Sequence, residues 1–388
     1  MNFDKKLVAL KASSENKCVK IMLTGLGSVG EYLLDYLLSL SDESLEIIVA
    51  GRSYDKMISD VNIVKVASAI RQQNKSKVII ESGCDLNNED SVRAVISKHC
   101  PDILVNTSRV YSGLKYGSIS WSKFRAYGIW APLAVKYIKL ISAVVNKESP
   151  KTMVINTSYS DAINPWIKGA TGVCPEFGSG NINHLIPRLK FAAAEQLGIA
   201  DFWNVDVTMA TSHFHDVVIS KEGHSETMPQ LLNIKYKGKE LDFKQEKLFS
   251  KCKIAMPVDQ KRNMMNASSN LEIITALLSA VRAKKVIKIH TPGAMGEIGG
   301  YPFMIDGSKM SGYFDETVFS MTEMRRANRQ SIAFDGIENV SGDTLTYTDK
   351  LIEAVKAHFK VTLPKSVSYG ESDGVAEFII ENIIKKAI

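Results

Sequence analysis

The sequence has few cysteines, and their arrangement indicates neither a disulfide framework nor a metal site. The 388-residue chain has five: Cys18, Cys84, Cys100, Cys174 and Cys252. The number is odd, the spacing is wide, and no two of them form the CxxC pair that is typical of metal-binding and redox proteins. A reducing cytosol is the simplest setting for such a chain, so we expect a cytoplasmic protein.

Long hydrophobic runs and biased composition are also lacking. No stretch approaches the ~20 apolar residues that cross a bilayer, so we expect no membrane partner. The N-terminus is polar and lysine-rich, without the apolar core of a signal peptide. With 25 Gly, 11 Pro and 45% hydrophobic residues, the composition excludes collagen-like, low-complexity and generally disordered chains. A globular protein remains, and its length suggests two domains.

The chain carries little excess of either charge. Its 48 basic and 42 acidic side chains give a net charge of +6. The basic residues are scattered rather than gathered in one run, so we do not expect a nucleic-acid partner. A mildly basic surface favours the approach of an anionic small molecule or cofactor.

The first half of the chain alternates between strand-like and helix-like segments. Short apolar runs predict strands at residues 20–24, 45–51, 77–80, 102–106 and 152–156. Helical spacing of apolar residues predicts helices at residues 31–40, 91–99 and 129–145. Strands separated by helices imply a parallel sheet covered on both faces. We therefore predict an α/β fold with a Rossmann-type doubly wound sheet in a dinucleotide-binding domain at 19–160.

The pattern changes after residue 160. Helices are expected at 187–198 and 270–284, strands at 205–211 and 286–290, and antiparallel hairpins at 231–249 and 299–314. The second hairpin turns at Asp306-Gly307. We predict an α+β substrate domain at 161–388, which includes a C-terminal extension from residue 341 with a helix at 348–359.

A glycine-rich turn, Gly25-Leu26-Gly27-Ser28-Val29-Gly30, directly follows the first strand and opens a helix. In this context Gly25 permits the tight turn, Gly27 lets the backbone approach a pyrophosphate, and Gly30 lets helix and sheet pack closely. The helix N-terminus offers free N–H groups and a positive dipole end to the phosphates. The six residues of the turn are therefore predicted to bind a dinucleotide cofactor.

The end of the second predicted strand bears on the choice of cofactor. An acidic residue there would bind the ribose hydroxyls of NAD. The sequence instead has Gly51-Arg52-Ser53. A guanidinium and a hydroxyl suit the 2′-phosphate of NADP, so we predict NADP with NAD as the alternative, bound in part by Arg52 and Ser53. The competing interpretation is that Arg52 is only solvated.

Polar residues also follow the later predicted strands, where open α/β sheets bind ligands. They are Asn106, Thr107 and Arg109 after one strand, Asn156 after another, Arg188 after a GSGN turn, and His213 and His215 after a fourth segment.

The order of these motifs resembles the lactate/malate dehydrogenases. The most similar stretch is GSGNINHLIPRLKFAAAEQLGI, which looks like the glycine-rich turn, substrate arginine and following helix of that family. DILVNTSRV, VINTS, VTMATSHFHD, NASSNLEIITALLSAV and GGYPFMIDGSKMSGYF agree in order and spacing. The similarity spans roughly residues 20–340. In the first domain, VAGRS and DLNNEDSVRAVI also resemble saccharopine dehydrogenase-like proteins.

The resemblance implies roles for individual residues. Arg188 matches the arginine that grips a substrate carboxylate, which a guanidinium binds bidentately. His213 best matches the histidine that exchanges a proton with the substrate oxygen, and His215 competes with it for a place at the substrate. Asn156 matches the asparagine that orients substrate and cofactor. Arg109 falls in the loop that closes on the substrate.

The same resemblance places Asn106 and Thr107 beside the nicotinamide, and Lys115 in the closing loop. The sequence departs from the family at Leu185, where the family has the aspartate that pairs with its histidine. His184 is adjacent but cannot replace a negative charge, so the charge state and tautomer of the histidine are not fixed in the same way.

These observations favour an NAD(P)-dependent dehydrogenase or reductase that acts on the carbonyl of a small carboxylate-bearing substrate, a 2-oxo or 2-hydroxy acid. One alternative is an opine- or saccharopine-type dehydrogenase acting on an imine or secondary amine. Another is a non-catalytic nucleotide-sensing protein, which Leu185 favours. No metal site is expected, because no acidic or cysteine ligand accompanies the histidines at a recognised spacing. We expect a homodimer or larger homo-oligomer.

Overall fold

The computed structural model describes residues 1–111 and 113–387. Within them, parallel strands form a six-stranded sheet in the order β3-β2-β1-β4-β5-β6. The strands are β1 (Val19–Thr24), β2 (Leu45–Ala50), β3 (Lys77–Glu81), β4 (Ile103–Asn106), β5 (Met153–Asn156) and β6 (Phe177–Gly178). The order 3-2-1-4-5-6 is that of the Rossmann fold. The predicted doubly wound sheet is therefore confirmed.

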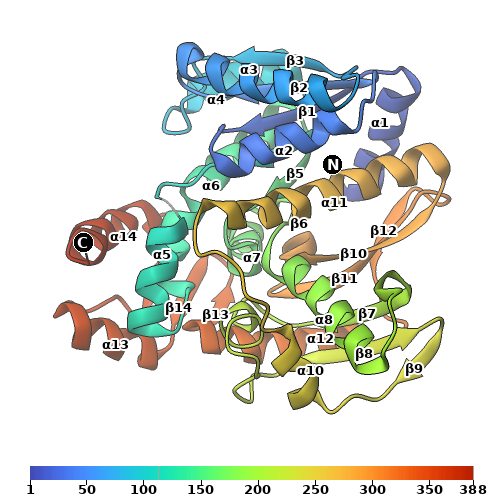
Figure 1. The fold of residues 1–388 in the computed structure, drawn as a ribbon. Helices are drawn as coiled ribbons and strands as arrows, with labels where there is room; N and C mark the ends of the chain where they lie inside the picture. The colour runs from blue at the N-terminus through green and yellow to red at the C-terminus, as the bar shows by residue number, and fades with distance from the viewer. Residues whose placement is uncertain (112, 388) are drawn as a thin grey trace.

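One face of the sheet is covered by helices from three parts of the chain. They are α1 (Phe3–Glu15), α2 (Ser28–Ser39), α3 (Tyr54–Arg71) and α11 (Asn263–Ala283). Figure 1 shows α11 running alongside α2, and the two are in extensive contact. Their apolar side chains share one core with the sheet, for example Leu33, Ile155 and Ile273.

The other face carries α4 (Glu89–His99), α6 (Ala131–Glu148) and α7 (Ser160–Thr171). Contrary to the expectation from the sequence, one helical segment of the described chain, Gly128–Glu148, is long and apolar enough to span a membrane by length and composition. However, 72% of its 18-residue window is buried inside the protein. That burial is typical of a core helix, and α6 indeed packs between α4 and the C-terminal α14 (Ser372–Ile379).

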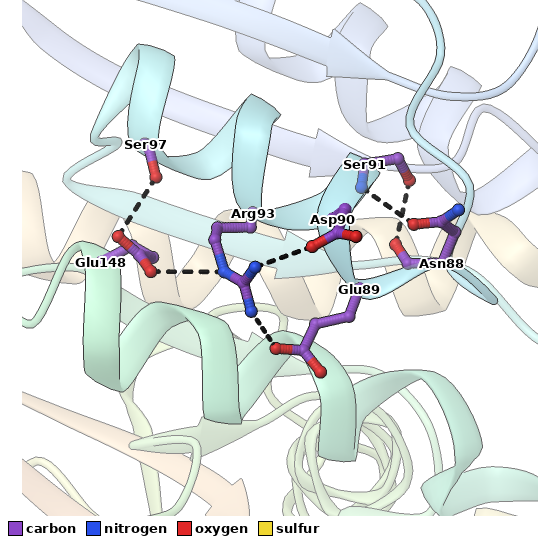
Figure 2. A network of polar contacts seen from close by, with 7 residues as sticks. All are labelled: Asn88, Glu89, Asp90, Ser91, Arg93, Ser97 and Glu148. Carbon is purple, nitrogen blue, oxygen red and sulfur yellow. Dashed lines mark hydrogen bonds and ion pairs between the residues drawn. The ribbon is translucent and has the colours of Figure 1, made fainter.

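A charged network on the surface joins α4 to α6 (Figure 2). Arg93 contacts Glu89 and, at 2.7 Å, Asp90 on its own helix, and its Nε lies 3.4 Å from Glu148 at the end of α6. Ser97 donates to the other oxygen of Glu148 at 3.4 Å. The network fixes the two helices side by side, although exposed pairs of this kind each contribute only about 0.2–1 kcal/mol.

The second half of the described chain contains three small antiparallel sheets, of which two lie before the C-terminal part and the third is β13-β14-β15 within it. Of the first two, one consists of β7 (Val205–Ala210), β8 (Leu231–Tyr236) and β9 (Lys239–Leu241), and the other of β10 (Val286–Pro292), β11 (Gly300–Asp306) and β12 (Ser311–Phe314). The helices that pack against the first of these are α8 (Asn181–Leu197) and α9 (His215–Val218). The predicted α+β character with antiparallel hairpins is therefore confirmed.

The expected hairpin at 231–249 was only partly right. Its first part forms β8 and β9, but α10 (Gln245–Cys252) follows. Leu248, Phe249 and Cys252 are buried, and their i, i+1, i+4 spacing matches one face of a helix rather than the alternation of a strand. Figure 1 shows α8 and α10 near the β7–β9 sheet.

The C-terminal part folds back onto the first half. It consists of α12 (Met321–Ser331), β13 (Ile337–Ser341), β14 (Thr344–Tyr347), α13 (Asp349–Phe359), β15 (Ser366–Ser368) and α14. The predicted helix at 348–359 is α13, which Thr348 caps. The short α5 (Gly113–Ile119) lies near α13 and α14 in Figure 1. The division at residue 160 stays a prediction, and β6 of the central sheet lies beyond it.

Candidate active site

A cavity of about 1150 Å³ lies at the carboxyl ends of the central strands. Its lining comes from the glycine turn, the loops after β4 and β5, helix α8, the segment after β7, and the segment between α10 and α11. The residues that line the cavity include Gly27, Ser28, Val29, Thr107, Arg109, Tyr127, Tyr159, Asp161, His184, Arg188, His213, Asp216, Ser220, Lys221, Asp259 and Arg262. Residues of the predicted cofactor turn and of the predicted substrate site thus face one space.

The three glycines of the turn have different surroundings. Gly25 has a φ of +97°, and a Cβ there would lie 2.2 Å from Ser108 Oγ. A Cβ on Gly30 would lie 2.5 Å from the carbonyl oxygen of Gly25. A Cβ on Gly27 would meet nothing within 4 Å, because this residue caps α2 at the cavity wall. Two glycines therefore serve the packing of the turn, and Gly27 leaves space in front of the helix N-terminus.

The rest of the predicted cofactor site lies around this turn. Ser28 and Val29 line the cavity, and Leu26 packs against the core below α2. Arg52 and Ser53 are exposed at the end of β2 and do not line the cavity. Arg52 forms no ion pair among the described residues, so its guanidinium is free for a ligand.

Asn106 and Thr107 tie β4 to the glycine turn. Thr107 Oγ1 donates to the carbonyl oxygens of Thr24 and Gly25, at 3.1 and 2.7 Å. The Asn106 amide is buried and its Nδ2 lies 3.5 Å from Asn156 Oδ1. Thr107 therefore faces the cavity, whereas Asn106 supports the wall behind it.

Asn156, expected to contact substrate, is fully buried in this network. Its Nδ2 donates to the Ser158 carbonyl oxygen at 3.2 Å and to Asn164 Oδ1 at 3.1 Å. Its Oδ1 accepts the backbone N–H of Ser158 at 3.1 Å. The side chain does not line the cavity, so its observed contacts hold the loop after β5.

His213 is paired with a carboxylate, although not with one from the expected position. Its Nδ1 lies 2.9 Å from Oδ2 of Asp335, the last residue of a 3-10 helix (Ile332–Asp335). The contact is an ion pair when the imidazole is protonated. Asp335 has no exposed surface. Burial alone would lower the pKa of His213, but Asp335, together with the weaker influence of Asp161 and Asp216, outweighs it and raises the pKa above the usual 6.5.

Other groups fix the position of Asp335 and surround His213. The backbone N–H of Tyr127 donates to Asp335 Oδ1 at 2.7 Å, and the Tyr159 hydroxyl donates to Oδ2 at 2.8 Å. The rings of these two tyrosines lie 4.6 and 5.1 Å from the imidazole. A second buried carboxyl group, Asp161, faces the same cavity, and burial raises its pKa to about 6. His213 therefore has two carboxyl groups and two aromatic rings around it.

Arg188 lies inside the protein rather than on the surface of α8. The residue is 3% exposed, and its Nη1 donates to the carbonyl oxygens of Cys252 and Ser220 at 3.0 and 3.4 Å. Its Nη2 lies 3.0 Å from the Met256 sulfur. Burial lowers its pKa, and its Nε has no hydrogen-bond partner among the described residues. No carboxylate there lies within ion-pair distance of this guanidinium, so it is available to an anion.

The remaining predicted residues divide between the cavity and its surroundings. Arg109 lines the cavity, and its Nη2 donates to the Thr157 carbonyl oxygen at 3.0 Å. Lys115 is exposed on α5, 5.8 Å from the centre of the Tyr111 ring, and does not line the cavity. His215 is buried behind the cavity wall, and burial lowers its pKa to about 3. A neutral His215 outside the cavity makes no contact with the space where substrate would bind.

Leu185 stands where the resemblance places an acidic residue, and Asp335 is the carboxylate that lies beside His213 instead. Leu185 is fully buried in the apolar core that α8 shares with β7 and β8. The carboxylate beside His213 instead comes from Asp335, 150 positions further along the chain than Leu185. Sequence reasoning missed Asp335, Asp161 and Tyr159. The sequence did show that position 185 carries no acid. That absence indicated that a carboxylate beside His213 would have to come from another part of the chain, but it did not indicate which part.

Among the described residues, one group has metal-ligand geometry: Glu222, His224 and Glu226. Arg125 forms ion pairs with both glutamates, with Nη1 2.6 Å from Glu222. These carboxylates are therefore already neutralised by a cation.

No protein-family model matches the chain, and no curated protein matches it in sequence. Solved structures do match. Malate dehydrogenase from Cryptosporidium parvum is 14% identical with a TM-score of 0.54, covering 81% of this chain and 96% of its own. Lactate dehydrogenase from Eimeria maxima, with NADH and oxamate, is 15% identical with a TM-score of 0.54, covering 81% and 91%.

Lactate dehydrogenase from Cryptosporidium parvum, complexed with lactic acid and nicotinamide adenine dinucleotide, is 14% identical. Its TM-score is 0.55, and the match covers 82% of this chain and 98% of that one. The chain therefore has a lactate/malate dehydrogenase-like fold, which confirms the resemblance seen in the sequence. Likeness at this level of identity establishes the fold.

Proposed function

We propose that the protein is an NADP- or NAD-dependent oxidoreductase acting on a small carboxylate-bearing 2-oxo or 2-hydroxy acid. The observation that carries the proposal is the shared cavity. Gly27 at the helix N-terminus, the His213–Asp335 pair and the buried Arg188 all line it or act directly on its lining. These groups would bind a dinucleotide, exchange a proton and hold a carboxylate. A cytoplasmic location and a homo-oligomeric state remain predictions.

The residues around the glycine turn fit a dinucleotide. Gly27 has no side chain to occupy the space before α2, and no side chain caps that helix. The free backbone N–H groups and the helix dipole favour a pyrophosphate at this place. The nicotinamide group of such a cofactor supplies or accepts the hydride.

The chain's own groups supply orientation and a proton. Arg188, whose guanidinium has no carboxylate partner among the described residues, would bind the substrate carboxylate and so fix the neighbouring carbonyl. His213, whose protonated form is stabilised by Asp335, would donate its proton to the substrate oxygen during reduction and recover it during oxidation. The buried setting keeps water from competing for this proton.

The preference for NADP rests on Arg52. The Eimeria and Cryptosporidium lactate dehydrogenases were solved with NADH and with nicotinamide adenine dinucleotide. This chain has an unpaired arginine and a serine at the end of β2, which suit a 2′-phosphate. Stronger thermal stabilisation by NADP than by NAD would support the preference.

The test of the function combines turnover and cofactor binding. A panel of 2-oxo acids is assayed by nicotinamide absorbance with the wild type, Arg188→Lys and Arg188→Met. Removing one partner of a buried charge pair costs about 2–5 kcal/mol, so KM for the acid should rise at least about thirtyfold in Arg188→Met. Stabilisation by NADP should persist in both variants. Unchanged KM would contradict the role of Arg188, and cofactor binding without turnover of any acid would support the non-catalytic alternative.

A further inference from the structure

A second set of polar side chains, in the wall of the cavity, is not used by the proposed proton transfer. Four buried side-chain atoms there have no hydrogen-bond partner among the described residues: His184 Nε2, Arg188 Nε, Asp216 Oδ1 and Ser220 Oγ. His184, Arg188 and Ser220 are each at least nine-tenths buried, and all four residues line the cavity. Buried polar groups are rarely left without partners, so this group is expected to meet a ligand.

Two of these atoms are hydrogen-bond acceptors. Burial would raise the pKa of Asp216, but nearby positive charges, led by Lys221 and Arg262, keep it well below its usual value, so the carboxylate is ionised. Lys221 lies 3.6 Å from Oδ2, which leaves Oδ1 for another donor.

His184 provides the second acceptor. Burial lowers its pKa to about 4, so the ring is neutral near pH 7, and the backbone of Met265 engages it by a hydrogen bond. A neutral imidazole has one N–H. In the tautomer with its proton on Nδ1, the unpartnered Nε2 has a lone pair for a donor.

The acceptors stand beside the unpaired arginine. His184 and Arg188 are four residues apart on α8 and therefore share one face of that helix. Asp216 lies on α9, which packs against α8, and its charge raises the pKa values of both side chains against the effect of burial. A guanidinium next to two acceptors is complementary to a carboxylate next to an ammonium group.

We propose that this cluster of His184, Arg188, Asp216 and Ser220 recognises an α-aminocarboxylate group. Arg188 binds the carboxylate, while Asp216 Oδ1 and His184 Nε2 accept N–H groups of the ammonium, with the Ser220 hydroxyl beside them. A 2-oxo acid has no donor for these acceptors, and a hydroxyl has one. The inference rests on the proposed function only in sharing Arg188 as the carboxylate anchor. It assigns an amino acid to the site and favours the C–N over the C–O form of the substrate.

The test compares three ligands with one carbon skeleton: norvaline, 2-hydroxyvalerate and 2-oxovalerate. Their dissociation constants are measured by calorimetry on the full chain saturated with NADP. Norvaline should bind the wild type at least about tenfold more tightly than 2-hydroxyvalerate, since an unmatched buried acceptor is costly. Asp216→Asn should weaken norvaline binding at least about tenfold and change 2-hydroxyvalerate binding less than about threefold.

Two further variants control the test. Asp259 also lines the cavity, but its Oδ1 already accepts the backbone N–H of Lys261 at 2.8 Å, so Asp259→Asn should keep the preference for the amino acid. Asp216→Glu keeps the charge and should retain most of the preference, which separates lost recognition from lost folding. A common loss for both ligands in Asp216→Asn, or no preference in the wild type, would overturn the inference.

The outcomes also separate this inference from the proposed function. Asp216-dependent binding of norvaline without hydride transfer to or from any acid would support the recognition site and overturn the proposed activity. Turnover of 2-hydroxy acids with no binding of norvaline would overturn the recognition site and leave the activity in place.

Discussion

At the scale of single residues, the charge state of His213 depends on one carboxylate far along the chain. Asp335 comes from the segment after α12, and its two oxygens are held by Tyr127 and Tyr159 while Oδ2 lies against the imidazole. No local pattern around Asp335 in the sequence indicates this contact, because it is made only when the C-terminal part folds back onto the first half. The sequence shows that position 185 carries no acidic residue, but it does not show that Asp335 supplies the carboxylate instead.

We expect Asp335→Asn to lower the pKa of His213, because burial is then opposed only by the weaker influence of Asp161 and Asp216. The rate of carbonyl reduction requires protonated His213, so its fall with rising pH should move about 1–3 units to lower pH. The pH profile of kcat/KM, or the proton resonance of the His213 ring as a function of pH, measures the shift. Tyr159→Phe is the matched control: it removes one hydrogen bond of Asp335 but keeps the carboxylate, so the profile should stay near that of the wild type.

The pairing of His213 with Asp335 also predicts how the free energy of unfolding of Asp335→Asn depends on pH. The folded pKa of His213 is raised, so its contribution to the free energy of unfolding is fully present below the unfolded pKa and is lost as the pH rises through the folded value. Asp335→Asn should therefore cost more stability at about pH 5.5 than at about pH 8.5 in urea unfolding. An equal cost at both pH values would contradict the pairing.

Of the other residues expected at the substrate site, some line the cavity and others do not, and packing explains the difference. Arg188 and His213 both reach the cavity, where the order of motifs placed them. Asn156 lies behind the cavity wall, because neighbouring amides and backbone groups satisfy both ends of its side chain. His215 turns away into the protein. Side-chain direction after a strand depends on the packing of the following loop, which sequence spacing does not contain.

At the scale of elements, the glycine turn separates packing from ligand binding within one motif. Gly30 approaches the Gly25 carbonyl so closely that a methyl group would force the turn to move, whereas Gly27 has open space and an ordinary backbone conformation. The two positions therefore allow a matched pair of alanine variants.

Gly27→Ala should fold with nearly the stability of the wild type, yet bind NADP at least about tenfold more weakly, because its methyl group occupies the place of a phosphate. Gly30→Ala should lose about 1–3 kcal/mol of stability by overpacking. Urea unfolding and calorimetric titration with NADP measure the two effects. Normal NADP affinity in a folded Gly27→Ala protein would contradict binding of the cofactor at this turn.

Elements with clear periodicity were predictable, and weakly patterned ones were not. The strands β1 to β5 of the central sheet are short apolar runs, and their positions agree with the sequence to within one or two residues, whereas the two-residue β6 was not predicted. Helix α1 escaped prediction because it buries only Phe3, Leu7 and Leu10 among its apolar residues, within a lysine-rich stretch. The alternation of apolar and charged residues led to the prediction of a strand where α10 forms, because charged residues lie close to the few buried ones in this segment.

At the scale of the whole molecule, the two apolar cores cross the predicted division at residue 160. The core on one face of the sheet joins residues of α1, α2 and the central strands to α11 and β11. The core on the other face joins α4 and α6 to β14, α13 and α14. Each face of the Rossmann sheet is thus completed by chain that follows residue 160, including the C-terminal extension. The extension serves to cover α6, a role that its sequence alone did not indicate.

This arrangement predicts that the dinucleotide-binding half cannot fold on its own. A fragment of residues 19–160 would expose the surfaces that α11 and α14 cover, and it would also lack β6 of the sheet. We expect the fragment to aggregate or to melt without a cooperative transition. The full chain should instead unfold in one step, with tryptophan fluorescence and far-ultraviolet circular dichroism giving the same midpoint. A soluble fragment with a cooperative melt and NADP-dependent stabilisation would show that the division at 160 is a true domain boundary, and that the shared cores add stability without being required for the fold.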